Sequence, residues 1–181
     1  MSEIRTARLL MRRWRDEDRA PFAAMNADAE VMQHFPAALT KQESDAFLDR
    51  IEAGFAEHGY GLWALEDETG FIGFTGLAWA TFDAPFTPAL EVGWRLARSA
   101  WGKGYASEAG TAALTFGFAK VDSIVSFTAL TNEPSRRVME RIGMYRVSEF
   151  AHPTVERGHR LERHVLYRAD RQTWMPHSVL V

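Results

Sequence analysis

Residues 89–120 read ALEVGWRLARSAWGKGYASEAGTAALTFGFAK, and this stretch decides the expected fold. Leu90–Leu96 has the apolar character of a strand, Gly102 and Gly104 follow in a short loop, and a long alanine-rich helix begins after Gly104. Glycines at a strand–helix junction let a ligand come close to the backbone. The unpaired N–H groups of the first helical turn and the helix dipole favour an anion there. The stretch therefore predicts a phosphate-binding site.

Neither of the two common nucleotide-binding loops fits this junction. A mononucleotide loop would need Lys and Ser or Thr after its second glycine, where Tyr105 and Ala106 stand. A dinucleotide fingerprint would need a third glycine at Ser107. A nucleotide-binding protein is therefore a weak alternative. We expect three basic side chains to add positive charge beside the unpaired N–H groups: Arg95, Arg98 and Lys103.

The run WGKGYASEA, Trp101 to Ala109, resembles the coenzyme A pyrophosphate loop of the GNAT superfamily of N-acetyltransferases. The family pattern is Gln/Arg-x-x-Gly-x-Gly/Ala. Gly104 and Ala106 match it, and Trp101 departs from it at the first position. This departure is familiar in the ribosomal-protein N-terminal acetyltransferase-like (Rim-type) branch, where WGKGYA followed by Glu-Ala is common.

A second run, NEPSRRVMERIGM from Asn132 to Met144, resembles the other GNAT signature, which is Asn-x-x-Ser/Ala, an apolar helix and Gly-Phe/Met. Asn132 is also a favourable helix N-cap, and Gly143 a favourable C-cap. The N-terminus resembles the opening of the Rim-type branch, roughly Thr-x-Arg-Leu-x-Leu-Arg, at Thr6, Arg8, Leu9 and Arg12. The resemblance thus covers nearly the whole chain.

Periodicity and turn signals predict the other elements. A helix beginning near Asp16 follows the first strand, and a second helix is predicted between a capping box at Thr40–Glu43 and a glycine stop at Gly59. In the family, these first helices border the acceptor side. The other expected strands are residues 8–14, 60–66, 71–79, 123–130, 145–150 and 160–167.

The loop between Ala80 and Pro88 holds two phenylalanines and two prolines. Its aromatic side chains could form a wall of a binding site, a dimer contact or a lid that folds back, and the sequence does not choose among the three.

Composition restricts the class of protein. With 181 residues, 46% hydrophobic and 25% charged, the chain is expected to form one domain over residues 1–181. The net charge of −3 argues against a general nucleic-acid binder. The chain has no cysteine, and its six histidines are scattered without metal-ligand spacing, so we expect neither a thiol nucleophile nor a metal. Without an apolar run of membrane-spanning length or a signal peptide, a cytoplasmic protein is expected.

The resemblance implies an α/β (α+β) GNAT fold. This is a twisted mixed sheet of six or seven strands with four to five helices, splayed between the strand at Leu90 and the strand at Ser123. Acetyl-coenzyme A would lie in the split, with its pantetheine arm along the backbone of Trp94, Arg95 and Leu96. The residues implied to hold the rest of the cofactor are Trp101, Gly102, Lys103, Gly104, Tyr105, Ala106 and Asn132.

The implied reaction is direct attack of an amine on the thioester. Glu91, on the face of its strand that Gly93 and Arg95 share, is the candidate general base, although it could instead only pair with Arg95 or another neighbour. The family position for a proton-donating tyrosine is Met139 here, so Ser135 is the candidate group to orient the leaving thiolate, or only a helix-capping residue. The alternative is an acyl-coenzyme A sensor or scaffold that does not transfer the acyl group. The acceptor stays open among protein N-termini, polyamines, amino acids and antibiotics, that is, a small-molecule or peptide amine, and a homodimer is possible.

Overall fold

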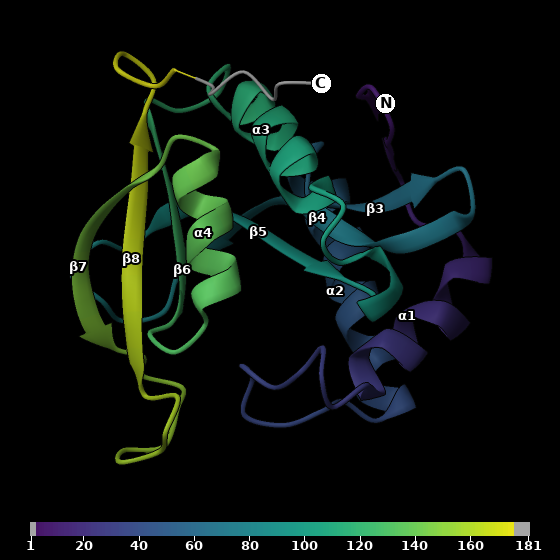
Figure 1. The fold of residues 1–181 in the computed structure, drawn as a ribbon, viewed down its shortest axis with the longest axis horizontal. Coiled ribbons are helices and arrows are strands. Elements are labelled where there is room, and N and C mark those ends of the chain that lie inside the picture. Colours follow the sequence, from purple (N-terminus) through teal and green to yellow (C-terminus); the bar gives the residue numbers. More distant parts are fainter. Residues whose placement is uncertain (1–2, 176–181) are drawn as a thin grey trace.

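Eight strands form one twisted mixed sheet in the computed structural model, which describes residues 3–175 (Figure 1). Their order is β1-β2-β3-β4-β5-β6-β8-β7. The two-residue strand β1 brings the number above the six or seven expected. The strands are β1 (Ile4–Arg5), β2 (Leu10–Arg12), β3 (Leu62–Asp67), β4 (Gly70–Ala80), β5 (Ala89–Leu96), β6 (Ser123–Ala129), β7 (Tyr145–Ala151) and β8 (Arg163–Asp170).

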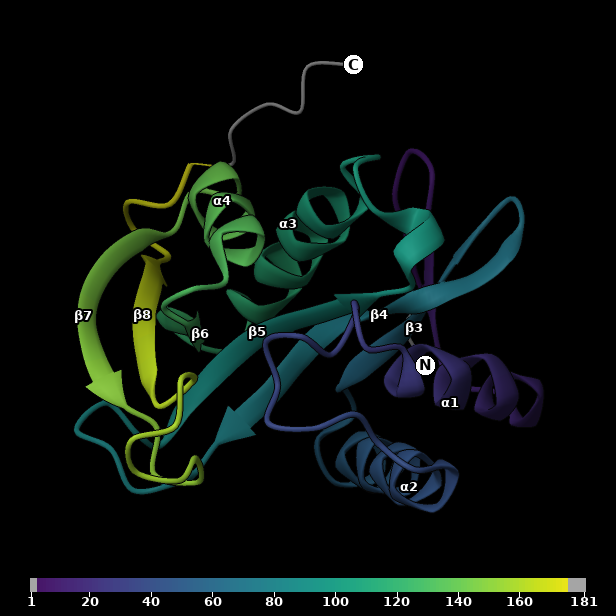
Figure 2. The same ribbon diagram turned by 60° about the horizontal axis from the view of Figure 1, so that its bottom comes forward.

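Four α-helices in this part of the chain cover the two faces of the sheet: α1 (Arg19–Ala27), α2 (Lys41–His58), α3 (Tyr105–Gly117) and α4 (Glu133–Arg141). Figure 2 shows α3 and α4 on one face and α1 and α2 on the other. Short 3-10 helices, η1 (Asp16–Asp18) and η2 (Arg98–Ala100), precede α1 and α3. The mixed sheet with two helical layers agrees with the expected fold class.

Local sequence signals set the ends of the helices. The capping box at α2 is confirmed, since the Thr40 hydroxyl accepts a hydrogen bond from the Glu43 N–H at 3.2 Å and the Glu43 carboxylate accepts one from the Thr40 N–H at 2.7 Å. Gly59 ends this helix with a φ of 75°, a left-handed conformation that glycine adopts without steric cost. At α4, the Asn132 side chain caps the helix as predicted.

The sheet splits between β5 and β6. These parallel strands share one register pair in the described structure, Glu91 with Val125, whereas β5 pairs with β4 along its whole length from Ala89 to Leu96. The predicted splay is therefore confirmed. Strand β6 pairs with β8 along its other edge but shares no further register pair with β5, so the sheet forms two halves that diverge from the Glu91–Val125 pair (Figure 1).

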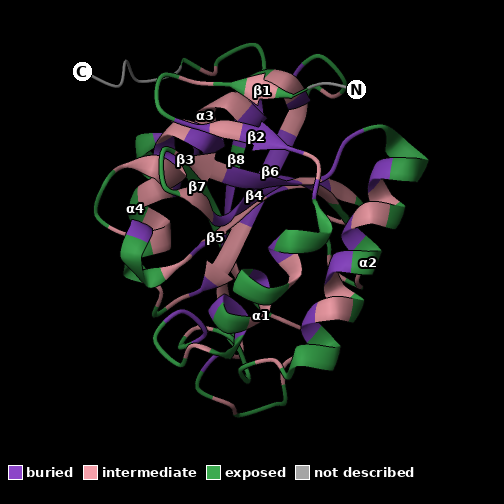
Figure 3. Ribbon diagram, turned by 90° about the vertical axis from the view of Figure 1, so that its right-hand side faces the viewer, coloured by how far each residue is buried: buried purple, intermediate pink, exposed green. Residues whose placement is uncertain are grey.

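The core lies on both faces of the sheet, and Figure 3 shows buried residues on the sheet and on the inner sides of the helices. On the α3 face, Ala109 and Ala113 are fully buried, so their small side chains let the helix pack closely on the sheet. On the other face, aromatic rings dominate: the Phe22 ring centroid lies 4.7 Å from that of Trp14 and 5.6 Å from that of Phe47. The sequence after Asp170 gave no structural expectation, and its last residues, 176–181, lie outside the described part.

Candidate active site

A cavity of about 840 Å³ occupies the split between β5 and β6. No β6 residue pairs with residues 92–96 of β5, so the backbone groups of these residues on that side are left for another partner. Eleven of the twelve residues that the sequence assigned to a site line the cavity: Glu91, Trp94, Arg95, Leu96, Trp101, Gly102, Gly104, Tyr105, Ala106, Asn132 and Ser135. Lys103 does not.

Helix α3 begins at the cavity without a side-chain cap. Its N-cap is Gly104, with a φ of 79°, and Glu108 donates the first helical hydrogen bond back to the Gly104 carbonyl. The N–H groups of residues 105–107 thus have no carbonyl in their own helix to bind. A Cβ added at Gly102 would meet no atom within 4 Å, so the approach to these groups is open. The geometry suits an anion.

The three expected cations do not gather at the start of α3. Arg98 pairs with Glu30 at 2.8 Å, and Lys103 lies over the Tyr105 ring at 5.7 Å from its centroid. The guanidinium of Arg95 lies on the α1 and α2 face, where it donates to Asn26. Sequence adjacency was misleading here, because strand alternation and the turns after β5 send these side chains in different directions.

An arginine from the N-terminal segment reaches the start of α3 instead. The Arg8 guanidinium donates to the Lys103 carbonyl at 2.9 Å and to the Glu108 carboxylate at 2.7 Å. Glu108 also accepts from the Thr6 hydroxyl at 2.6 Å. Glu108 therefore fixes the N-terminal segment against α3.

Glu91 lies at the point where the split begins. Its carboxylate has no hydrogen bond or ion pair within residues 3–175, and it lies 3.8 Å from where a Cβ on Gly93 would be, so these two residues share a face as strand alternation predicts. The expected alternative of a pair with Arg95 is not observed. Burial raises the pKa of Glu91 to about 8. A carboxyl group with such a pKa can exchange a proton near neutral pH.

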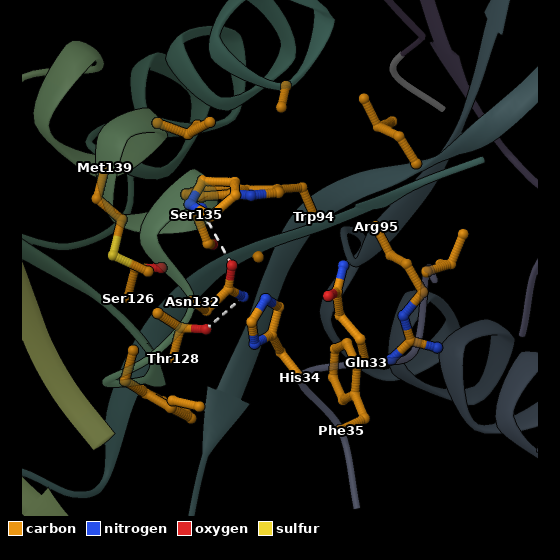
Figure 4. A pocket seen from close by; sticks show the side chains of 18 of the residues that line it. Gln33, His34, Phe35, Trp94, Arg95, Ser126, Thr128, Asn132, Ser135 and Met139 are labelled. Atoms are coloured by element: carbon orange, nitrogen blue, oxygen red, sulfur yellow. Dashed lines mark hydrogen bonds between the residues drawn. The ribbon is translucent and has the colours of Figure 1, made fainter. Parts of the chain in front are cut away.

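Across the split, α4 presents Asn132 and Ser135 (Figure 4). The Asn132 side chain accepts from the Ser135 N–H at 3.2 Å and donates to the Thr128 hydroxyl at 2.9 Å, so it caps α4 and also joins the helix to β6. Met139, one turn further, is 1% exposed and contributes an apolar surface to the cavity. Tyr145, which follows the end of α4, does not line the cavity, and its hydroxyl donates to Asp170.

Comparison with known proteins identifies the family. Residues 8–145 match the model of the acetyltransferase (GNAT) domain. The chain belongs to the GNAT acetyltransferase family. It is 32% identical to the uncharacterized N-acetyltransferase YnaD of Bacillus subtilis over 150 residues, which cover 81% of this chain and 85% of that protein.

Solved structures agree in fold. The GNAT-family acetyltransferase of Bacillus anthracis superposes with a TM-score of 0.77 at 24% identity, covering 94% of this chain and 99% of that one. Mycobacterium smegmatis RimJ, solved in complex with a coenzyme A disulfide, superposes with a TM-score of 0.73 at 17% identity, covering 94% and 87%. The expected likeness to Rim-type enzymes thus holds at the level of the fold.

Two polar residues that line the cavity of this acetyltransferase were not predicted from the sequence. The Ser107 hydroxyl is buried and has no hydrogen-bond partner in the described structure, and the same is true of His34 Nδ1. Burial, and secondarily the charge of Arg160, lower the pKa of His34, so its ring is neutral at neutral pH. In the sequence, Ser107 stands out only because it occupies the position of the third glycine of a dinucleotide fingerprint. No sequence pattern indicates that His34 lies near β5.

The aromatic loop between Ala80 and Pro88 supports the cavity from behind. Phe82 packs on Phe127 and on His152, with ring centroids 5.3 Å and 4.5 Å apart, and the latter two residues line the cavity. His152 also lies 4.7 Å from His164, and burial together with this neighbour lowers the pKa of His152 to about 4. This end of the cavity is therefore apolar and uncharged.

Two further findings concern the part of the chain that the structure describes. None of its helices combines the length and apolar character needed to cross a membrane. No three of its His, Cys, Asp and Glu side chains gather in a way that could hold a metal ion.

Proposed function

We propose that this acetyltransferase transfers the acetyl group of acetyl-coenzyme A to a primary amine, with the coenzyme seated between β5 and β6. One observation carries the proposal: the uncapped N-terminus of α3 opens onto the cavity at the point where β5 has lost its partner strand. An extended chain of amides that ends in a pyrophosphate fits this combination, since the strand edge suits the amides and the helix start suits the phosphates.

In this proposal, the backbone of Trp94, Arg95 and Leu96 binds the pantetheine amides. The N–H groups from Gly102 to Ala106 bind the pyrophosphate, and the Ser107 hydroxyl adds a donor. Hydrogen bonds to charged groups contribute about 1.5–3 kcal/mol each, so a few such donors give micromolar binding after the entropy of association is subtracted. Trp101 holds the loop in place through a hydrogen bond from its indole to the Leu96 carbonyl at 2.9 Å.

Glu91 is the proposed general base. The amine nitrogen attacks the thioester carbonyl carbon, the carbon–sulfur bond breaks, and the proton lost from the nitrogen goes to the Glu91 carboxylate, directly or through water. The pKa of about 8 suits this role, because a base titrating near the working pH is both available and strong enough. The departing thiolate needs less help, since a thiol has a pKa of about 8.5.

Ser135 is proposed to orient the thiolate with its hydroxyl, and Asn132 to hold Ser135 in place. The support is geometric: both residues line the cavity on the α4 side, opposite β5, and the Asn132 side chain binds the Ser135 backbone. We also propose that the chain forms a single domain. Strand β8 lies beyond the residues that match the family model, yet it pairs with β6 inside the same sheet. A cytoplasmic location and a homodimer stay predictions from the sequence.

Thiol release from acetyl-coenzyme A tests the proposed function. With a panel of primary amines of the small-molecule and peptide classes, free thiol should appear at a rate that depends on the amine, together with the acetylated amine in equal amount. Binding of acetyl-coenzyme A without release for any amine would support the acyl-coenzyme A sensor instead.

A further inference from the structure

Arg12 and Arg95 both extend their side chains into the fold, but their guanidinium groups have different partners. Arg12 lies among carboxylates, with Asp18 at 2.7 Å and Glu66 at 2.7 Å. Arg95 has no carboxylate partner among residues 3–175. Its one hydrogen bond within them is to the Asn26 side-chain oxygen at 2.6 Å. Since an uncompensated buried charge is costly, the acidic partners of Arg12 are what a buried guanidinium ordinarily needs.

Aromatic rings surround the guanidinium of Arg95. Its central carbon lies 4.2 Å from the ring centroid of Phe35, 5.6 Å from that of Phe47 and 5.5 Å from that of Phe74. These rings hold the guanidinium in position but accept no N–H hydrogen bond of ordinary strength. Burial lowers the pKa of Arg95 to about 10, so the group is still charged at neutral pH. A fixed cation with several unused donors therefore remains.

This cation faces the cavity on the side of the proposed base. Arg95 lines the cavity, its Nε is buried without a hydrogen-bond partner in the described structure, and alternation along β5 puts its side chain on the face of Glu91. In Figure 4, the Arg95 side chain lies beside the Phe35 ring and points away from Trp94 and Ser135. Helices α1 and α2 cover this face, whereas α3, with its anion-suited N-terminus, covers the other (Figure 2). The Arg95 guanidinium is thus separated from the proposed pyrophosphate site by the sheet.

The cavity is poor in negative charge. Of the described residues that line it, two carry carboxyl groups, Glu30 and Glu91. Glu30 is paired with Arg98, and Glu91 is largely protonated at neutral pH because its pKa is about 8. A polyamine or another polycationic acceptor would need several carboxylates to replace its hydration. The charge of the cavity disfavours acceptors of that class.

We propose that the acceptor amine carries a carboxylate, which the side chain of Arg95 binds while the amine lies near Glu91. This inference rests on the proposed function and names the class of its acceptor. Glu91 and Arg95 are separated by about 13 Å along the strand, so several bonds must lie between amine and carboxylate. A short peptide with a free C-terminus or an ω-amino acid has several bonds between its amine and its carboxylate, and the Glu91 and Arg95 side chains span the remaining distance. A free α-amino acid is too short.

Matched pairs of amines test the inference. Each pair consists of a carboxylate and its amide: the dipeptide Phe-Gly and its C-terminal amide, and 6-aminohexanoate and its amide. The parent protein should acetylate the carboxylate member with a kcat/KM about 10- to 100-fold higher, the range expected for a charge-assisted hydrogen bond. In Arg95→Met the preference should disappear, because the side chain that binds the carboxylate is lost.

Arg50→Met is the matched control. Arg50 also lies over the Phe47 ring, at 5.6 Å, but it is exposed and does not line the cavity, so this variant should keep the preference. The folding of Arg95→Met is checked by circular dichroism and by its unfolding midpoint, because the substitution removes a charge but also leaves the buried Asn26 side-chain oxygen without its donor. Equal rates for the two members of each pair in the parent, or a preference that survives Arg95→Met, would overturn the inference.

A binding measurement separates this inference from the proposed function. Calorimetric titration of the coenzyme A complex with 3-phenylpropionate and with its amide needs no transfer. If no amine is acetylated but the carboxylate binds at least tenfold more tightly than the amide in an Arg95-dependent manner, the carboxylate site stands and the proposed transfer fails. If amines are acetylated but neither measurement favours the carboxylate, the proposed function stands and the inference fails.

Discussion

Glu91 on β5 and Val125 on β6 form the one register pair that joins these strands in the described structure. The pair places an ionisable side chain where the sheet begins to divide, on the wall of the cavity. Desolvation there disfavours the charged carboxylate, which is the physical reason that the group retains its proton to a higher pH.

The first prediction concerns the pH dependence of turnover. In the parent, kcat should rise as the pH increases through about 8, because only the ionised Glu91 accepts a proton. Glu91→Gln should lower kcat by about 100-fold or more at pH 7.5 and leave the Kd of acetyl-coenzyme A within about twofold. The defect should narrow above pH 9, where the acceptor amine loses its proton unaided. If the variant and the parent had equal kcat values from pH 6 to 9, Glu91 would not be the general base.

Glu91→Gln should lower kcat but increase the free energy of unfolding at alkaline pH. Folding raises the pKa of Glu91 from 4.5 to about 8, so the folded state keeps a proton that the unfolded state releases. The parent therefore loses stability as the pH rises between these values, by the order of a few kcal/mol. Urea denaturation should find Glu91→Gln more stable than the parent at pH 8.5 and similar to it at pH 4.5. A difference that does not depend on pH would contradict the raised pKa.

Ser107→Ala should weaken the binding of acetyl-coenzyme A without weakening the fold. The hydroxyl is buried without a partner in the described structure, so its removal should leave the free energy of unfolding unchanged or slightly higher. The Kd should increase about 10- to 100-fold, as for one lost hydrogen bond to a charged group. Thr75→Val is the control, since Thr75 has a buried, unpartnered hydroxyl that does not line the cavity. A Kd that changes equally in both variants would rule out a contact from Ser107.

Ser135→Ala should reduce turnover by no more than about tenfold, below the usual range for acid–base groups. A thiolate leaves tolerably well without a proton donor, and the variant keeps the N–H that binds Asn132. Steady-state kinetics at saturating acetyl-coenzyme A measure the effect, with Met139→Leu as a volume-conserving control on the same helix. A loss above a thousandfold, with folding and cofactor affinity intact, would show a larger role for the serine.

The sequence predicted the features that depend on neighbouring residues. The capping box at Thr40–Glu43, the glycine junction at Gly104 and the shared face of Glu91 and Gly93 follow from turn chemistry and from the two-residue period of strands. These signals extend over a few residues, so no tertiary contact is needed to read them.

The features that the sequence did not predict depend on contacts between distant segments. Arg8 replaces the expected cations at the start of α3 through contact with Glu108, a hundred residues away. The position of His34 depends on a segment that Arg160 reaches when it donates to the Gln33 carbonyl at 2.9 Å, and no local pattern connects these residues. Two of the three rings around Arg95, Phe35 and Phe47, likewise come from segments that lie far from β5 in the sequence.

Calorimetric titration with acetyl-coenzyme A, applied to a pair of glycine variants, tests most directly whether the cofactor binds in the split. Gly104→Val would place a side chain at the N-cap of α3, with its Cβ 3.5 Å from the Arg8 guanidinium, whereas Gly59→Val carries similar backbone strain at the end of α2, since their φ values are 79° and 75°. We predict a micromolar Kd for the parent and for Gly59→Val, and binding at least tenfold weaker for Gly104→Val. Circular dichroism should show that all three proteins are folded. An unchanged Kd in folded Gly104→Val would contradict the assignment of the cofactor to this site.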